Sequence, residues 1–154
     1  MKTNFYIAAL SLLTLCLFAS CEDDGDTVKP VIDLREPGEG ARLPIGDEHG
    51  VHFEMDLSDN EALASYTIEV HNNFDHHDHD TKAVAETQAF YFKKIYTDCA
   101  GLKEHHVHNH DIVIPATATP GDYHLMVWCA DAEGNENRVA RNIVLGTATA
   151  PDKR

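Results

Sequence analysis

The sequence is poor in basic residues. Its 12 Lys and Arg stand against 26 Asp and Glu, which gives a formal net charge of −14 with neutral histidines. A surface with this charge repels the phosphates of nucleic acids and anionic lipids, and it attracts cations. We therefore expect no nucleic-acid partner.

Common catalytic motifs are also missing. The sequence has no Gly-x-Ser-x-Gly, no His-Glu-x-x-His, no phosphate-binding loop and no Cys-x-x-Cys. His124 and Met126 are an axial ligand pair for haem, but residues two apart on one strand cannot ligate opposite faces of the same haem. The sequence therefore predicts a protein that is not an enzyme and does not carry haem.

Long apolar runs are limited to one, at the N-terminus, from Phe5 to Phe18 behind the positive charge of Lys2. An apolar stretch of about 7–15 residues suits a secretory signal peptide, whereas roughly 20 residues are needed to cross a bilayer. Small residues, Ala19 and Ser20, precede Cys21. This order predicts a signal peptide at residues 1–20.

The residues around Cys21 make that prediction more specific. Leu17-Phe18-Ala19-Ser20-Cys21 resembles a bacterial lipobox, with Phe18 where leucine is commoner. The resemblance implies a lipid on Cys21, which attaches the mature chain to a membrane. The acidic residues Glu22 to Asp26, in a tether at 21–28, resemble the export tag that sends lipoproteins to the outer face of the outer membrane in one phylum of anaerobic Gram-negative bacteria. A solvated linker and a periplasmic location are the alternatives.

Cysteine is scarce beyond the N-terminus. Cys16 falls in the signal peptide and Cys21 carries the lipid, so Cys99 and Cys129 remain. In an oxidising compartment two thiols can form a disulfide, although two buried free thiols are the alternative.

No segment after residue 20 has a convincing helical period. Apolar residues alternate with polar ones at 51–57, 66–71 and 123–129, and further short strands are expected near 31–34, 88–96, 112–114 and 139–145. About seven short strands predict an all-β fold, a two-sheet immunoglobulin-like sandwich of the cadherin or fibronectin kind, with a closed barrel as the alternative. The domain is expected at 29–147, followed by a polar tail at 148–154.

A larger resemblance covers about Lys29 to Leu145. The segments that carry it are Asp59 to Asp75, the histidine-rich stretch that follows, and Ile114-Pro115 to Tyr123-His124. They resemble a histidine-rich, immunoglobulin-like lipoprotein domain family of unknown function from the same anaerobic Gram-negative bacteria. The resemblance implies the sandwich fold and a cell-surface location, and it assigns no activity.

Histidine is the abundant functional residue type, with 11 in the chain. Neutral imidazole is the commonest protein ligand for divalent transition metals. In an immunoglobulin-like sandwich the strands at 65–71 and 121–131 are antiparallel neighbours, which places His71 close to His124. We expect one metal site, with His105 and His49 outside it, whose ligands come from His71, His76, His77, His79, His108, His110 and His124. Zinc is expected first, and copper or nickel next.

Two classes of function remain. The first is a surface-anchored lipoprotein that captures, buffers or senses zinc or copper, with an outer-membrane receptor or another surface protein as its partner. The second is a structural or adhesion module that binds a protein or a glycan, in which the histidines are incidental.

Overall fold

A computed structural model describes residues 25–73 and 87–146 of the protein. The predicted signal peptide, the lipid-bearing Cys21 and the C-terminal tail lie outside the described residues. The described chain forms eight strands in the order β1 (Val31–Glu36), β2 (Ala41–Pro44), β3 (Phe53–Ser58), β4 (Leu63–Asn72), β5 (Phe92–Tyr96), β6 (Glu104–Asn109), β7 (Gly121–Asp131) and β8 (Glu136–Gly146).

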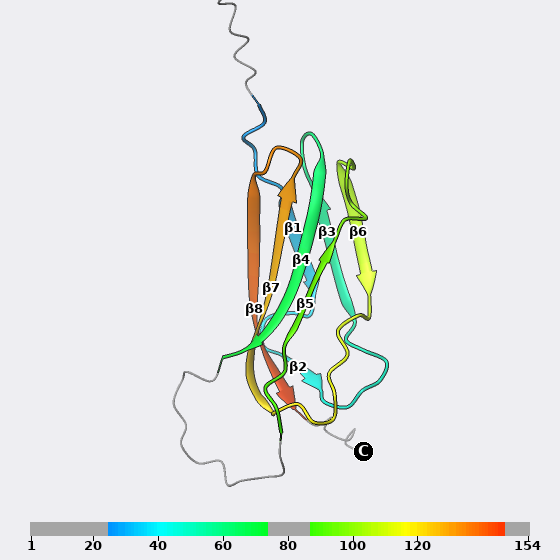
Figure 1. The fold of residues 1–154 in the computed structure, drawn as a ribbon, viewed down its shortest axis with the longest axis vertical. Coiled ribbons are helices and arrows are strands. Elements are labelled where there is room, and N and C mark those ends of the chain that lie inside the picture. The colour runs from blue at the N-terminus through cyan, green and yellow to red at the C-terminus, as the bar shows by residue number, and fades with distance from the viewer. Residues whose placement is uncertain (1–24, 74–86, 147–154) are drawn as a thin grey trace, which may run out of the picture.

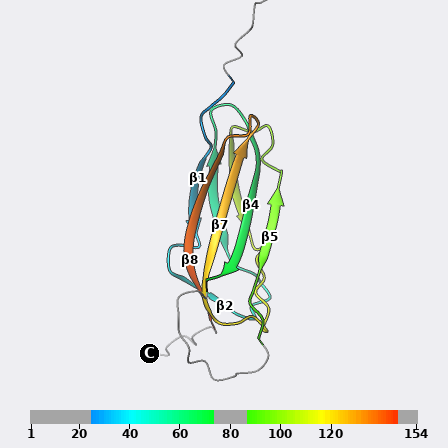
Figure 2. The same ribbon diagram turned by 60° about the vertical axis from the view of Figure 1, so that its left-hand side comes forward.

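The strands form two sheets that pack face to face (Figures 1 and 2). A three-stranded sheet has the order β1-β3-β6, and a five-stranded sheet has the order β2-β8-β7-β4-β5. All neighbours are antiparallel except β2 and β8, which are parallel. The prediction of an all-β, two-sheet sandwich is confirmed.

The core forms because successive side chains on a strand point to opposite faces. On β3, for example, Phe53, Met55 and Leu57 are buried, while the residues between them are partly exposed. The same alternation buries one face of β4 and one face of β7. The polar residues between these positions therefore lie on the outer faces of the sandwich.

The strands differ from the predicted ranges at β2, at β6, which no predicted range covers, and at residues 112–114. β2 was not predicted, because it is short and its pairing with β8 brings together distant parts of the chain. Residues 112–114 were predicted as a strand but join no sheet. The carbonyls of Ile112 and Ile114 accept single hydrogen bonds of 2.9 Å from the backbone of Val51 and Gly46. Both isoleucine side chains are buried, so the apolar pattern reflects buried side chains and not a hydrogen-bonded strand.

Tyr123, at the start of β7, fixes the connections around it. Its hydroxyl donates a hydrogen bond to the carbonyl of Thr119 (2.8 Å) and accepts one from the backbone N–H of Phe90 (3.0 Å). Burial raises the pKa of this phenol above its ordinary value, so the hydroxyl keeps its proton. Tyr123 thus ties the segment before β5 to the segment before β7.

The sandwich has two distinct ends. The N-terminal segment enters at the end where β7 finishes and β8 begins, which is the upper end in Figure 1. The opposite end holds the start of β7 and the end of β4, and β6 runs toward it. None of the residues that the structure describes forms a helix long and apolar enough to cross a membrane.

Candidate metal site

Three histidines meet on the outer face of the three-stranded sheet. His52 directly precedes β3, His108 lies in β6, and His110 directly follows β6. Because Phe53 pairs with Asn109 and Glu54 pairs with His108, the antiparallel register brings His52 opposite His110. The three residues share the parity that points away from the buried Phe53 and Val107. We call them the trihistidine group.

The distances within this group suit a shared ion. The ring centroid of His52 lies 5.0 Å from that of His108 and 5.4 Å from that of His110, and the rings of His108 and His110 are 5.7 Å apart. One ring nitrogen from each residue lies within 4.8 Å of the other two. Zn–N bonds of about 2.0–2.1 Å place ligand atoms about 3.4 Å apart in a tetrahedral site, so small side-chain rotations would complete it.

A carboxylate and a backbone carbonyl support the group. Glu54 Oε2 lies 3.6 Å from His52 Nε2, and His110 Nδ1 lies 3.5 Å from the carbonyl oxygen of Gly50. A carboxylate beside a ligating imidazole orients the ring and raises its basicity. All three imidazoles are exposed, which leaves solvent access to a fourth position.

Gly50 allows the close approach of the β2–β3 loop to β6. Its φ is 76°, a left-handed conformation that favours glycine. A Cβ atom on this residue would lie 2.0 Å from the carbonyl oxygen of His110. Glycine at position 50 is therefore a requirement for placing His52 beside His110.

His106 lies on the same outer face but belongs to a different network. Its Nδ1 is 2.8 Å from Asp56 Oδ1, and Arg35 pairs with the same carboxylate. The hydrogen bond with His106, together with Arg35, holds the pKa of Asp56 below its ordinary value despite partial desolvation. His106 is thus engaged with Asp56 rather than with the trihistidine group.

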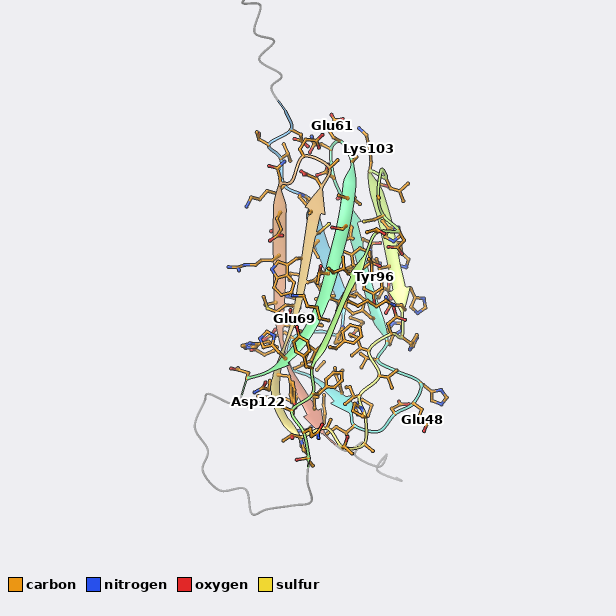
Figure 3. The ribbon with its side chains drawn as sticks, in the orientation of Figure 1. Glu48, Glu61, Glu69, Tyr96, Lys103 and Asp122 are labelled. Atoms are coloured by element: carbon orange, nitrogen blue, oxygen red, sulfur yellow. The ribbon has the colours of Figure 1, made fainter. Side chains whose placement is uncertain are left out.

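A second histidine pair lies on the outer face of the five-stranded sheet. His71 of β4 and His124 of β7 are direct cross-strand partners, and their ring centroids are 5.5 Å apart. Glu69 Oε1 lies 3.0 Å from His71 Nδ1, and the other oxygen of Glu69 pairs with Lys93 at 3.0 Å. Figure 3 shows Glu69 on the lower part of this sheet, with Asp122 nearer its lower end. The proximity of His71 and His124 is as the sequence predicted.

The described histidines therefore form two groups rather than the single site expected. His108 and His110 join His52, whereas His71 and His124 lie on the other outer face, across the core. Both groups lie away from the end where the N-terminal segment enters, because His71 is near the end of β4, His124 is near the start of β7 and His110 follows β6. His76, His77 and His79 lie outside the described residues. His49 is exposed in a loop, and His105 is half-buried, with its Nε2 3.5 Å from Asp98 Oδ2.

Sequence reasoning missed His52 as a candidate ligand. The alternation in the sequence already places His52 on the outer face, because it precedes the buried Phe53. In the same way His108 and His110 share the face opposite to that of the buried Val107. What the sequence lacked was the register between β3 and β6, two strands separated by more than forty residues of chain.

The two remaining cysteines are buried but not bridged. Cys99 and Cys129 are separate buried thiols in the structure, which corresponds to the alternative to the disulfide that the sequence allows. Burial raises the pKa of Cys129 to about 12, with a further contribution from Cys99, and burial also raises the pKa of Cys99. Protonated thiols in an apolar core pack as small hydrophobic side chains and are weak nucleophiles.

Comparison with known proteins places the chain in a family. No curated protein matches it. The model of a family described as a domain of unknown function, DUF4625, matches residues 19–146, which is most of the chain and includes every described strand. A histidine-rich composition and a lipid anchor are not part of that description. The protein belongs to the DUF4625 family, a domain of unknown function.

Proposed function

We propose that this protein is a lipid-anchored surface protein that binds a divalent transition metal ion through His52, His108 and His110. The observation that carries the proposal is the meeting of three ring nitrogens within 4.8 Å on adjacent strands. The antiparallel pairing of β3 and β6 holds the side chains there, so the group is built by the sheet itself.

The donor set favours particular metals. Imidazole suits zinc, copper and nickel, whereas calcium and magnesium prefer oxygen ligands. Zinc is the first candidate, because three histidines and one open position form a common zinc arrangement. Copper is the second, since its affinity for nitrogen ligands exceeds that of zinc.

The position of the group favours capture or buffering over a structural role. Structural zinc sites are closed by four protein ligands, and folding depends on them. The trihistidine group is exposed and lies outside the core, which is built from buried side chains of both sheets. A bound ion would therefore exchange with solvent, and the net charge of −14 would raise the local concentration of cations.

The cellular setting is part of the proposal. Acylation of Cys21 would attach the chain to the outer membrane, and the acidic residues behind it would direct the domain to the cell exterior, with a surface receptor as its partner. From residue 25 onward the chain contains all eight strands. A soluble protein that begins at residue 22 therefore keeps the whole sandwich and suits binding experiments.

The decisive experiment is a zinc titration of this soluble protein, with the bound metal counted. His108→Ala combined with His110→Ala should weaken binding by more than about tenfold and remove one ion per chain, because one imidazole remains in the group. His49→Ala combined with His106→Ala removes the same number of histidines from outside the group and should leave binding unchanged.

Zinc affinity should also fall as the pH drops below about 6.5, since imidazole must be neutral to ligate.

A third variant separates the two histidine groups. His71→Ala with His124→Ala removes the pair on the opposite face and should leave the trihistidine ion in place. Equal zinc binding by all three double variants would overturn the proposal, and it would leave the adhesion module as the better interpretation.

A further inference from the structure

The upper end of the sandwich holds a second candidate ion site of different chemistry. Asp26 of the N-terminal segment, Asp131 at the end of β7 and Glu133 in the β7–β8 turn each place a carboxylate oxygen within 4.8 Å of the other two. Among the described residues, no Lys, Arg or His forms an ion pair with any of these three. Three negative charges thus converge without a cation.

Burial shows that this group differs from an ordinary acidic surface. Asp131 is only 2% exposed. Burial acts to raise the pKa of Asp131, but hydrogen bonds from the side chain and backbone of Asn135 and from the backbone of Gly134 outweigh it, so the pKa lies below its ordinary value. Asp131 is therefore a buried anion.

Asp26 supplies independent evidence for a missing partner. Its Oδ1 accepts a hydrogen bond from the backbone N–H of Val28 (2.9 Å). Its Oδ2 is buried and accepts no hydrogen bond. Buried acceptors in native proteins are almost always paired with protein, water or an ion, and a carboxylate oxygen beside two other carboxylates favours a cation.

The neighbouring loop shows the same deficiency. Asp59 Oδ2 is also buried without a hydrogen-bond partner. Its loop joins that of Asp131, because the backbone N–H of Ala132 donates to the carbonyl of Ala62 (2.9 Å). Two buried carboxylate oxygens at this end, one on the N-terminal segment and one on the β3–β4 loop, thus have no hydrogen-bond partner among the described residues.

We propose that Asp26, Asp131 and Glu133 bind a calcium ion that clamps the N-terminal tether to the β7–β8 turn. All three donors are oxygens, which hard cations prefer, and Ca–O distances of about 2.3–2.6 Å accommodate ligand atoms as far as about 5 Å apart. Magnesium requires shorter bonds and a stricter octahedron, and it fits this spacing less well.

The clamp would reinforce contacts that already hold the tether. Asn135 Nδ2 donates to the backbone carbonyl of Asp26 (2.8 Å), and Asn137 Nδ2 donates to the carbonyl of Pro30 (2.9 Å). Asn135 in the turn and Asn137 in β8 thus bind the backbone of the N-terminal segment, and the ion would bind the Asp26 side chain. Calcium would make the tether and the sandwich one rigid unit.

Calcium titration of the protein from residue 22 tests this site, with thermal unfolding and calorimetry as readouts. Calcium should raise the melting temperature, with a Kd on the order of 10⁻⁴–10⁻³ M, as in extracellular modules. Glu133→Gln changes an exposed side chain and should weaken calcium binding by about tenfold or more. Glu136→Gln is the matched control, an exposed glutamate three residues further along the same hairpin, and it should have no effect.

Mobility of the tether provides the second readout. A spin label on Gly25→Cys, which is exposed while Cys99 and Cys129 are buried, should become immobile when calcium is added. Asp26→Asn should abolish that change. The site is refuted if calcium has no effect on melting, or if Glu133→Gln and Glu136→Gln bind it equally. Zinc binding measured on the same variants tests the trihistidine group separately, so either proposal can fail alone.

Discussion

Single residues decide how well the trihistidine group is assembled, and Gly50 is the clearest case. Its carbonyl lies beside His110, and its own hydrogen leaves room for the backbone of β6. The loop that it belongs to is pinned by the hydrogen bond from Val51 N–H to the carbonyl of Ile112. The distance between His52 and His110 therefore depends on a residue that is not itself a ligand.

Gly50→Ala should lower both stability and zinc affinity. A Cβ atom 2.0 Å from a carbonyl oxygen forces the loop away from β6, and the left-handed backbone adds a cost of about 1–3 kcal/mol. Gly101→Ala is the matched control, because Gly101 also has a positive φ, of 80°, but has no atom within 4 Å of an added Cβ. Urea unfolding should show a loss in both variants, while zinc titration should show a loss in Gly50→Ala alone. Unchanged zinc affinity in Gly50→Ala would mean that the loop does not position His52.

One contact at the residue scale was predicted from the sequence. The contact between His71 and His124 follows from the alternation in two strands and from their antiparallel neighbourhood in a sandwich, and the structure confirms that proximity. His52 was missed because the pairing register between β3 and β6 cannot be predicted from the alternation alone. A shift of one residue between β3 and β6 would turn His108 and His110 toward the core.

At the scale of elements, the outer strand β5 is held by a bridge to the β6–β7 connection. Asp111 Oδ2 accepts hydrogen bonds from Lys94 Nζ (2.7 Å) and from the hydroxyl of Tyr96 (2.8 Å). These bonds hold the pKa of Asp111 below its ordinary value of 3.8. The bridge links an edge strand of one sheet to the chain that leaves the other, and it needs an ionised carboxylate.

Acid should therefore weaken this bridge. A carboxyl group whose folded-state pKa is depressed adds stability above its unfolded pKa, and that stability is lost as the pH falls through the folded pKa. The stability difference between the wild type and Asp111→Asn should be largest near pH 6 and should shrink toward about pH 3. Urea unfolding at the two pH values measures it. Asp122→Asn, whose side chain has no hydrogen bond among the described residues, is the control, and a pH-independent difference for Asp111→Asn would contradict the mechanism.

The elements themselves were predictable where alternation is regular. β3, β7 and the part of β4 from Tyr66 onward bury every second residue, so their period identified them. β2 escaped prediction because four residues ending in Pro44 are too few to show a period. Residues 112–114 were wrongly predicted as a strand because two buried isoleucines flank an exposed valine, which is a strand pattern. Their backbone hydrogen bonds go instead to the β2–β3 loop.

At the scale of the whole molecule, the proposed location at the outer membrane depends on Cys21, which lies outside the sandwich. Cys21→Ser should leave the chain unacylated, because serine offers no thiol. Detergent partitioning and labelling with a fatty-acid analogue would detect the change. Cys99→Ser, which alters a buried thiol, should be labelled as the wild type is. Equal labelling of the Cys21 variant would rule out the lipid anchor.

The separation of the tether from the trihistidine group has a consequence for the ion that the group would hold. Val31, just after the tether, pairs with Ser58 of β3, and the six residues from Ser58 back to His52, at about 3.3 Å each, span roughly 20 Å. Screening at physiological ionic strength extends only about 8 Å from a charged bilayer. With the tether anchored as proposed, zinc at His52, His108 and His110 would equilibrate with the bulk medium, and its occupancy would be independent of headgroup charge.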